Sequence, residues 1–224
     1  TLEQDETNAI FGCMLRMGVT TVLGGECGIN RYDPIRYLDI VDRDGAPVNV
    51  ALLIGHSWLR ESVGHRDKYS HVTDNELQAM IPLCQQALDA GCFGISYGMR
   101  YVPGIDQREF VTTARTCVPD RRLIAAHVRD DAAGIFAAGR EFLDVARDLG
   151  LPAEVSHIGS MAAFGQMEEF LKMVDAYRLN GLDVTCDCYP YYAFSTAIGS
   201  TTYDEGWRQP RWKSLPLCGT PAPL

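Results

Sequence analysis

The chain has 224 residues, 46% of them hydrophobic and 22% charged, and its 20 Lys and Arg against 29 Asp and Glu give a net charge of −9. This length and composition allow one large hydrophobic core and exclude an intrinsically disordered chain. The acidic balance argues against sequence-independent binding of nucleic acid or of an anionic membrane. No run of 18 apolar residues predicts a membrane span, and the first residues, TLEQDET, do not resemble a signal peptide. Eight cysteines without a regular spacing indicate a reducing compartment, so we expect a cytoplasmic protein.

Six short apolar runs alternate with amphipathic stretches along the chain. The runs cover residues 18–25, 49–56, 92–99, 123–128, 153–157 and 183–189. Strands and helices that alternate at a spacing of about 30 residues predict βαβ units and a parallel sheet. Because the sequence has neither a GxGxxG nor a Walker phosphate loop, a barrel is favoured over a dinucleotide-binding fold. We therefore predict an α/β protein of the (β/α)₈ barrel type. The barrel is expected to be incomplete, with about strands two to seven present, since a full one needs about 250 residues.

The stretches between the runs have helical periodicity and recognisable ends. Thr73 and Glu76 predict a capping box before a helix over 75–90, in which Pro82 indicates a kink or a later start. Two further apolar stripes end at Gly150 and at Asn180-Gly181. We assign residues 1–206 to a partial barrel domain and the proline-rich residues 207–224 to an irregular tail, and expect the protein to be incomplete at both ends.

Three soft-metal ligands each end one of the apolar runs: Cys27, His127 and His157. Thiolate and imidazole are the ligands that zinc prefers, and three protein ligands with an open position are the catalytic arrangement rather than the structural one. In a parallel barrel, the residues that follow the strands lie on one rim, where such barrels carry their chemistry. The sequence therefore predicts a metal-dependent enzyme.

Several blocks of sequence carry a resemblance to a known family. They are GVTTVLGGECG, NVALLIGHSWLR, GISYGMRYVPG, HVRD, SHIGS and DVTCDCYPYYAFST. Each block lies at the end of a predicted strand, and together they resemble the N-acyl-D-amino-acid deacylases (D-aminoacylases) of the amidohydrolase superfamily. The resemblance covers residues 18–207.

The resemblance implies a zinc-dependent hydrolase whose small-molecule substrate is an N-acyl-D-amino acid. It implies that Cys27, His127 and His157 hold the tightly bound zinc. It also implies that Tyr189 approaches the carbonyl of the scissile amide, and that Tyr101 and Ser195 contact the substrate. A phenol in the place of Tyr189 can donate a hydrogen bond to the developing oxyanion.

The chain departs from the family pattern in four places. The H-x-H pair of the first strand is absent, and so is the aspartate that ends the eighth strand and serves as general base, for which Asp204 lies too near the seventh strand. Gly159 stands where many members have lysine, and Glu26 where they often have asparagine. We therefore expect this chain alone to be inactive or weakly active.

Other polar residues have competing interpretations. His56 ends its run near the predicted rim and is a candidate substrate contact, or else holds a loop. Arg60 and Arg100 are candidates for a substrate carboxylate, although an ordinary ion pair is the better explanation for each. Cys186 and Cys188 share one strand face and are expected to pack against helices. The acidic pair Asp130-Asp131 is interpreted as a helix start, where carboxylates suit the helix dipole.

Two other functions remain open at this point. One is a cyclic-amide hydrolase of the same superfamily, similar to dihydroorotase or hydantoinase, for which a lysine at a strand end would be expected. The other is a non-catalytic fragment that binds a metal or a partner. Because an open barrel leaves two unpaired sheet edges, we also expect either marginal stability or a homo-oligomer that covers those edges.

Overall fold

The computed structural model describes residues 9–162, 165–191, 193, 195–196 and 200–204. Its centre is a parallel sheet in which six strands follow one another in chain order, β1-β2-β3-β4-β5-β6. The strands are β1 (Thr21–Gly24), β2 (Asn49–Gly55), β3 (Gly94–Gly98), β4 (Leu123–His127), β5 (Ala153–Val155) and β6 (Val184–Cys186). All six predicted strands are confirmed, each shorter than its apolar run.

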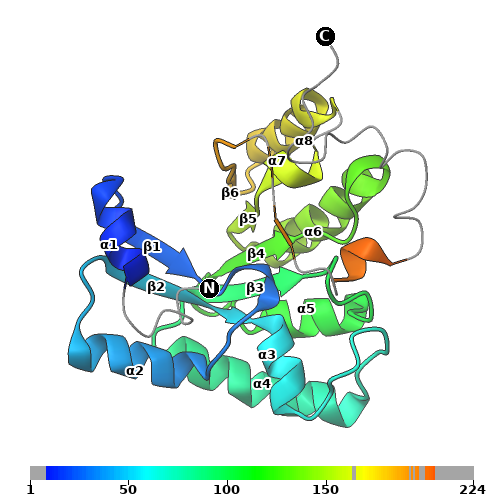
Figure 1. Cartoon of the computed structure of the whole chain (residues 1–224). Helices are drawn as coiled ribbons and strands as arrows, with labels where there is room; N and C mark the ends of the chain where they lie inside the picture. The colour runs from blue at the N-terminus through cyan, green and yellow to red at the C-terminus, as the bar shows by residue number, and fades with distance from the viewer. Residues whose placement is uncertain (1–8, 163–164, 192, 194, 197–199, 205–224) are drawn as a thin grey trace.

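Helices connect the strands and cover one side of the curled sheet. In Figure 1, α2 and α4 lie below β1–β3, whereas α6 and α8 lie beside β4–β6. The helices are α1 (Ala9–Arg16), α2 (Pro34–Asp44), α3 (His56–Ser62), α4 (Asp74–Asp89), α5 (Gln107–Arg115), α6 (Ile135–Leu149), α7 (Ile158–Met161) and α8 (Met167–Leu179). Three short 3₁₀ turns, η2 (Glu26–Gly28), η3 (Ala132–Gly134) and η4 (Thr201–Tyr203), lie in the loops.

Local sequence explains where the longer helices begin and end. Thr73 and Glu76 form the predicted capping box, with the Thr73 hydroxyl accepting from the Glu76 amide and the Glu76 carboxylate accepting from the Thr73 amide. The predicted late start is wrong, because α4 begins at Asp74 and continues through Pro82. Gly150 ends α6 in the left-handed conformation, with φ 67°, which glycine adopts without steric cost.

The main hydrophobic core lies between β2–β6 and the helices that cover them. Its largest fully buried side chains include Tyr97, Phe110, Phe142 and Phe170. A smaller cluster, in which Phe11 of α1 meets Val22 of β1 and Val48, closes the β1 end of the sheet. This alternation of strands and covering helices confirms the predicted α/β class, and it brings the carboxyl ends of all six strands to one edge.

Three further sequence-based expectations concern the ends of the domain, the edges of the sheet and membrane spans. The proline-rich segment 207–224 lies outside the described residues, as does the end of the proposed barrel domain. Among the described strands, β1 and β6 each have one strand neighbour, and the oligomer that would cover these edges stays a prediction. In the described part of the chain, no helix is long and apolar enough to cross a membrane.

Candidate metal site

Cys27, His127 and His157 meet at the carboxyl edge of the sheet. Cys27 lies in η2 directly after β1, His127 is the last residue of β4, and His157 lies two residues beyond β5. The Cys27 Sγ is 3.5 Å from His157 Nε2, and His127 Nδ1 is 2.7 Å from the same nitrogen. One ligand atom from each residue lies within 4.8 Å of the other two. These three residues are called the three-ligand site below.

Unusual backbone conformations aim two of the three ligands. Cys27 has φ 58° and His157 has φ 37°, both in the left-handed region that side-chain-bearing residues seldom adopt. Such strain persists where the surrounding structure enforces it, which is a common property of functional sites. Two neighbouring glycines allow the close backbone contacts that hold these conformations. A Cβ on Gly25 would collide with the Leu53 carbonyl, and one on Gly98 with the Cys27 carbonyl.

Three carboxylates line the side of the site next to β5 and β6. Ser156 Oγ donates to Glu154 Oε2 at 2.9 Å and lies 3.1 Å from Glu26 Oε2. The Asp187 carboxylate accepts from the backbone amide of His157. No sequence pattern predicts this grouping, because Glu26, Glu154 and Asp187 come from three separate parts of the chain.

Burial and these carboxylates set the charge states of the site. Burial, followed by the nearby carboxylates Glu26 and Asp187, raises the pKa of the Cys27 thiol to about 12. Burial and then repulsion from His127 lower the pKa of His157 to about 4, so its ring is neutral and able to ligate at pH 7. Burial raises the pKa of Glu26 to about 7, with the Asp187 charge adding to it. A bound divalent cation would compensate the negative charge gathered here, so the soft donor set and its electrostatics both fit zinc.

The structure brings Tyr101 next to the three-ligand site. Its ring packs on His127 with centroids 4.7 Å apart, and its hydroxyl is hydrogen-bonded to the Thr196 side chain. Burial, then the charge of the Cys27 thiolate, raises the pKa of the Tyr101 phenol. Ser195, which precedes Thr196, is exposed. Tyr101 therefore lies beside Thr196, the residue that follows Ser195 in the chain.

The Tyr189 side chain contacts a neighbouring tyrosine. Its half-buried ring stacks against Tyr191 with centroids 6.3 Å apart. It lies in the segment after β6 that also contains Asp187, the partner of the His157 amide. Cys186 packs partly against the core as expected, whereas Cys188 is exposed, contrary to the prediction that both thiols face helices.

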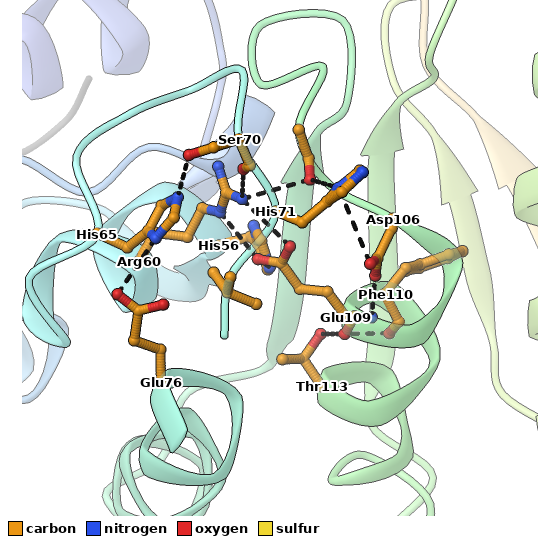
Figure 2. A network of polar contacts seen from close by, with 12 residues as sticks. His56, Arg60, His65, Ser70, His71, Glu76, Asp106, Glu109, Phe110 and Thr113 are labelled. Carbon is orange, nitrogen blue, oxygen red and sulfur yellow. Dashed lines mark hydrogen bonds and ion pairs between the residues drawn. The ribbon is translucent and has the colours of Figure 1, made fainter. Parts of the chain in front are cut away.

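His56 belongs to a separate buried cluster, shown in Figure 2, that it forms with Arg60 and Glu109. The three residues are 0%, 2% and 0% exposed, respectively. His56 Nε2 lies 3.1 Å from Glu109 Oε1, and Arg60 Nε donates to the same oxygen at 2.9 Å. The predicted contact of His56 with substrate does not fit this position, because protein atoms enclose the ring completely. These residues are called the Arg60 cluster below.

The Arg60 cluster joins two loops of the rim. Arg60 also donates to the carbonyl oxygens of Asp67, Ser70 and Gly104 at 3.2, 2.7 and 3.4 Å. Gly104 is needed here, since a Cβ would collide with the Ser70 carbonyl. Arg60 is thus committed to the loop after α3 and the loop after β3, which confirms an ordinary ion pair over a substrate carboxylate contact.

A cavity of about 360 Å³ opens beside the loop that carries Tyr101. It is lined by Met99, Arg100, Pro103, Arg129, Asp130, Thr201 and Asp204. Arg129 is held by a bidentate pair with Glu141, whereas Arg100 lies 3.6 Å from Asp130. The cavity is large enough for a small organic group and has charges of both signs in its wall.

The sequence of the chain is similar to those of characterised deacylases. No protein-family model matches the chain. A D-aminoacylase of Alcaligenes xylosoxydans xylosoxydans is 33% identical, with 82% of this chain and 43% of that protein covered. An N-acyl-D-glutamate deacylase of the same organism is 30% identical, covering 81% of this chain and 42% of that protein. The chain therefore spans less than half the length of the curated relatives it matches.

Solved structures agree with the sequence comparison. An N-acyl-D-glutamate deacylase from Bordetella bronchiseptica, in complex with zinc and a phosphonate inhibitor that mimics the tetrahedral intermediate, superposes with a TM-score of 0.74 at 30% identity. That match covers 85% of this chain and 45% of the deacylase. A D-aminoacylase with a binuclear metal center gives a TM-score of 0.72 at 28% identity, covering 82% of this chain and 45% of that one.

These matches confirm the resemblance and the barrel type of the fold, and they do not favour a cyclic-amide hydrolase. Neither of the two described lysines, Lys68 and Lys172, follows a strand, as that alternative would require. Over the residues it spans, the chain is homologous to D-aminoacylases and N-acyl-D-amino-acid deacylases, which are amidohydrolases, and it covers less than half of their length.

Proposed function

We propose that the three-ligand site binds one zinc ion, and that the chain forms part of a metal-dependent hydrolase that removes the acyl group from N-acyl-D-amino acids. The observation that carries this proposal is the convergence of Cys27, His127 and His157 within 4.8 Å, from the ends of β1, β4 and β5. Zinc in such a site polarises a carbonyl group and lowers the pKa of bound water to about 7.

The protein's own side chains would bind and orient the substrate around that site. Tyr101 lies against His127 and beside the Ser195 segment, which suits both to contact the acylated amino acid. Tyr189 is proposed to donate a hydrogen bond to the carbonyl oxygen of the amide as negative charge develops there. The small-molecule substrate class follows from the relatives, which are named for N-acyl-D-amino acids.

Proton transfer is where the chain by itself falls short. Amide hydrolysis needs a group that takes a proton from water and returns it to the leaving amine. The aspartate that does so in the family has no counterpart in this chain, and the H-x-H pair is absent as well. We therefore expect zinc binding without appreciable turnover of an N-acyl-D-amino acid by this chain alone.

Elemental analysis of purified protein tests the metal site. We expect about one zinc per chain in the parent and none in Cys27→Ala or His157→Ala. Cys84→Ala is the matched control, because it removes a thiol that is fully buried in the core, away from the site, and should retain the zinc. A parent chain that binds no zinc would overturn the proposal, as would zinc retained by both site variants.

A further inference from the structure

Asp131 contacts the outer side of the central ligand. It lies four residues after His127, and its Oδ1 is 3.1 Å from His127 Nε2. The other ring nitrogen, Nδ1, is 2.7 Å from His157 Nε2 and therefore faces the other ligands. The His127 ring is thus held at both nitrogens, with one side directed to the site and the other to a carboxylate.

Asp131 is itself held in place from the neighbouring strand. Arg100, which follows β3, has its Nε 3.8 Å from Asp131 Oδ2. The next residue, Tyr101, packs its ring on His127. The turn after β3 therefore supports the His127 ring directly through Tyr101 and indirectly through Arg100 and Asp131.

A helix-capping role does not account for the Asp131 side chain. Asp131 precedes η3, which agrees with its interpretation as a helix start, but its side chain makes no capping hydrogen bond. The carboxylate is only 20% exposed and is directed at His127 instead. Sequence reasoning missed this contact because an acidic pair before a helix has a sufficient local explanation.

A metal-ligating histidine usually donates its second ring N–H to a carboxylate or carbonyl, which fixes the ring orientation and strengthens the ligand. We propose that Asp131 is a positioning residue of the zinc site, which fixes the His127 ring with Nδ1 toward Cys27 and His157, and that Arg100 keeps the Asp131 carboxylate aimed at the ring. This inference rests on the proposed zinc binding and adds to it a residue outside the ligand set.

The test is the zinc affinity of the chain, measured by competition with a chromophoric chelator. We expect Asp131→Ala to weaken zinc binding by about 10- to 100-fold. Asp131→Asn, which keeps an acceptor oxygen, should restore part of that loss. Asp130→Asn is the matched control, because Asp130 lies 3.6 Å from Arg100 and has no contact with His127. This substitution removes the same charge but keeps an oxygen that can accept from the Asp131 backbone amide. It should change the affinity by less than about twofold.

A spectroscopic readout separates positioning from a general structural effect. With Co²⁺ in place of zinc, the visible bands should shift in Asp131→Ala and Arg100→Met but not in Asp130→Asn, because only the first two release the His127 ring. Circular dichroism melts of the metal-free variants should have the same midpoint as that of the metal-free parent. If Asp131→Ala does not fold, Asp131→Asn decides, and an affinity and spectrum equal to those of the parent would overturn the proposal.

The outcomes also separate this inference from the proposed function. A parent that binds no zinc removes both proposals. A parent that binds zinc tightly, with Asp131→Ala and Asp130→Asn indistinguishable from it, leaves the three-ligand site intact and removes only the positioning role of Asp131.

Discussion

The three-ligand site and the Arg60 cluster are both built around a histidine at the carboxyl end of a strand. His127 ends β4 and His56 follows β2 directly, and both residues are at most 4% exposed. Their partners differ. His127 meets a second imidazole, a thiol and Asp131, whereas His56 meets a carboxylate that Arg60 already neutralises. Position at a strand end therefore does not make a histidine a ligand; the groups that converge on it from other strands do.

Breaking the Arg60 cluster should have the largest effect on stability. Glu109→Ala leaves the Arg60 guanidinium and the His56 ring buried without their carboxylate, so we expect the free energy of unfolding to fall by about 3–5 kcal/mol. Urea unfolding measures this loss. Arg43→Ala, which breaks an exposed pair with Asp44, is the control and should leave the unfolding midpoint unchanged. Equal midpoints for both variants would contradict a stabilising role of the cluster.

Paired substitution of the two histidines sharpens the contrast between the regions. His56→Ala should cost about 2 kcal/mol of stability, since it opens a cavity and removes one of the two partners of the Glu109 carboxylate, while zinc remains bound. His127→Ala should abolish zinc binding. Its effect on the metal-free protein should be the smaller of the two. Thermal melts in a chelator, together with zinc content, give both readouts, and loss of zinc in His56→Ala would argue that the two regions are not independent.

A pH-dependent prediction concerns the carboxylates beside the three-ligand site. Burial, then the charges of Asp187 and Glu26, raises the pKa of Glu154 in the folded protein. Glu154 therefore costs no stability below the ordinary carboxyl pKa of about 4.5, where both states are protonated, and costs most above its raised folded pKa. Glu154→Gln in metal-free protein should add about 1–2 kcal/mol at pH 9 and little at pH 4.5.

The matched control for that experiment is Glu61→Gln, which removes an exposed carboxylate and should show no difference between the two pH values. A gain for Glu154→Gln that is the same at pH 4.5 and pH 9 would mean that the Glu154 carboxylate is not protonated on folding.

The smallest expected effect concerns the N-terminal cap of α4. Thr73→Ala removes the capping hydrogen bond of α4 and should lower stability by about 1 kcal/mol. Zinc affinity should not change, because α4 holds none of the ligands. Chemical unfolding and chelator competition measure the two quantities, and a weakened zinc site would show that the loop before α4 supports the three-ligand site.

Much of the fold could be predicted from the sequence because it depends on local signals. Apolar runs fixed the number and order of the strands, and Thr73 with Glu76 marked the start of α4. The start of that helix was nevertheless placed in doubt by Pro82, since periodicity alone does not show that a helix tolerates one missing backbone hydrogen bond. In the site, the convergence of Cys27, His127 and His157 was predictable, because it follows from residue type and position at the ends of parallel strands.

The sequence by itself determined the six strands, the residues that end them and the enzymes that they resemble, because these depend on periodicity, residue type and blocks of matching sequence. Only the tertiary structure decided that His56 is enclosed by Arg60 and Glu109, that Asp131 turns from its helix to His127, and that Glu26 and Glu154 face each other across Ser156. Most of these contacts join residues tens of positions apart. The local sequence around a residue therefore does not specify the partner of its side chain. That partner is determined by the packing of the surrounding strands and loops.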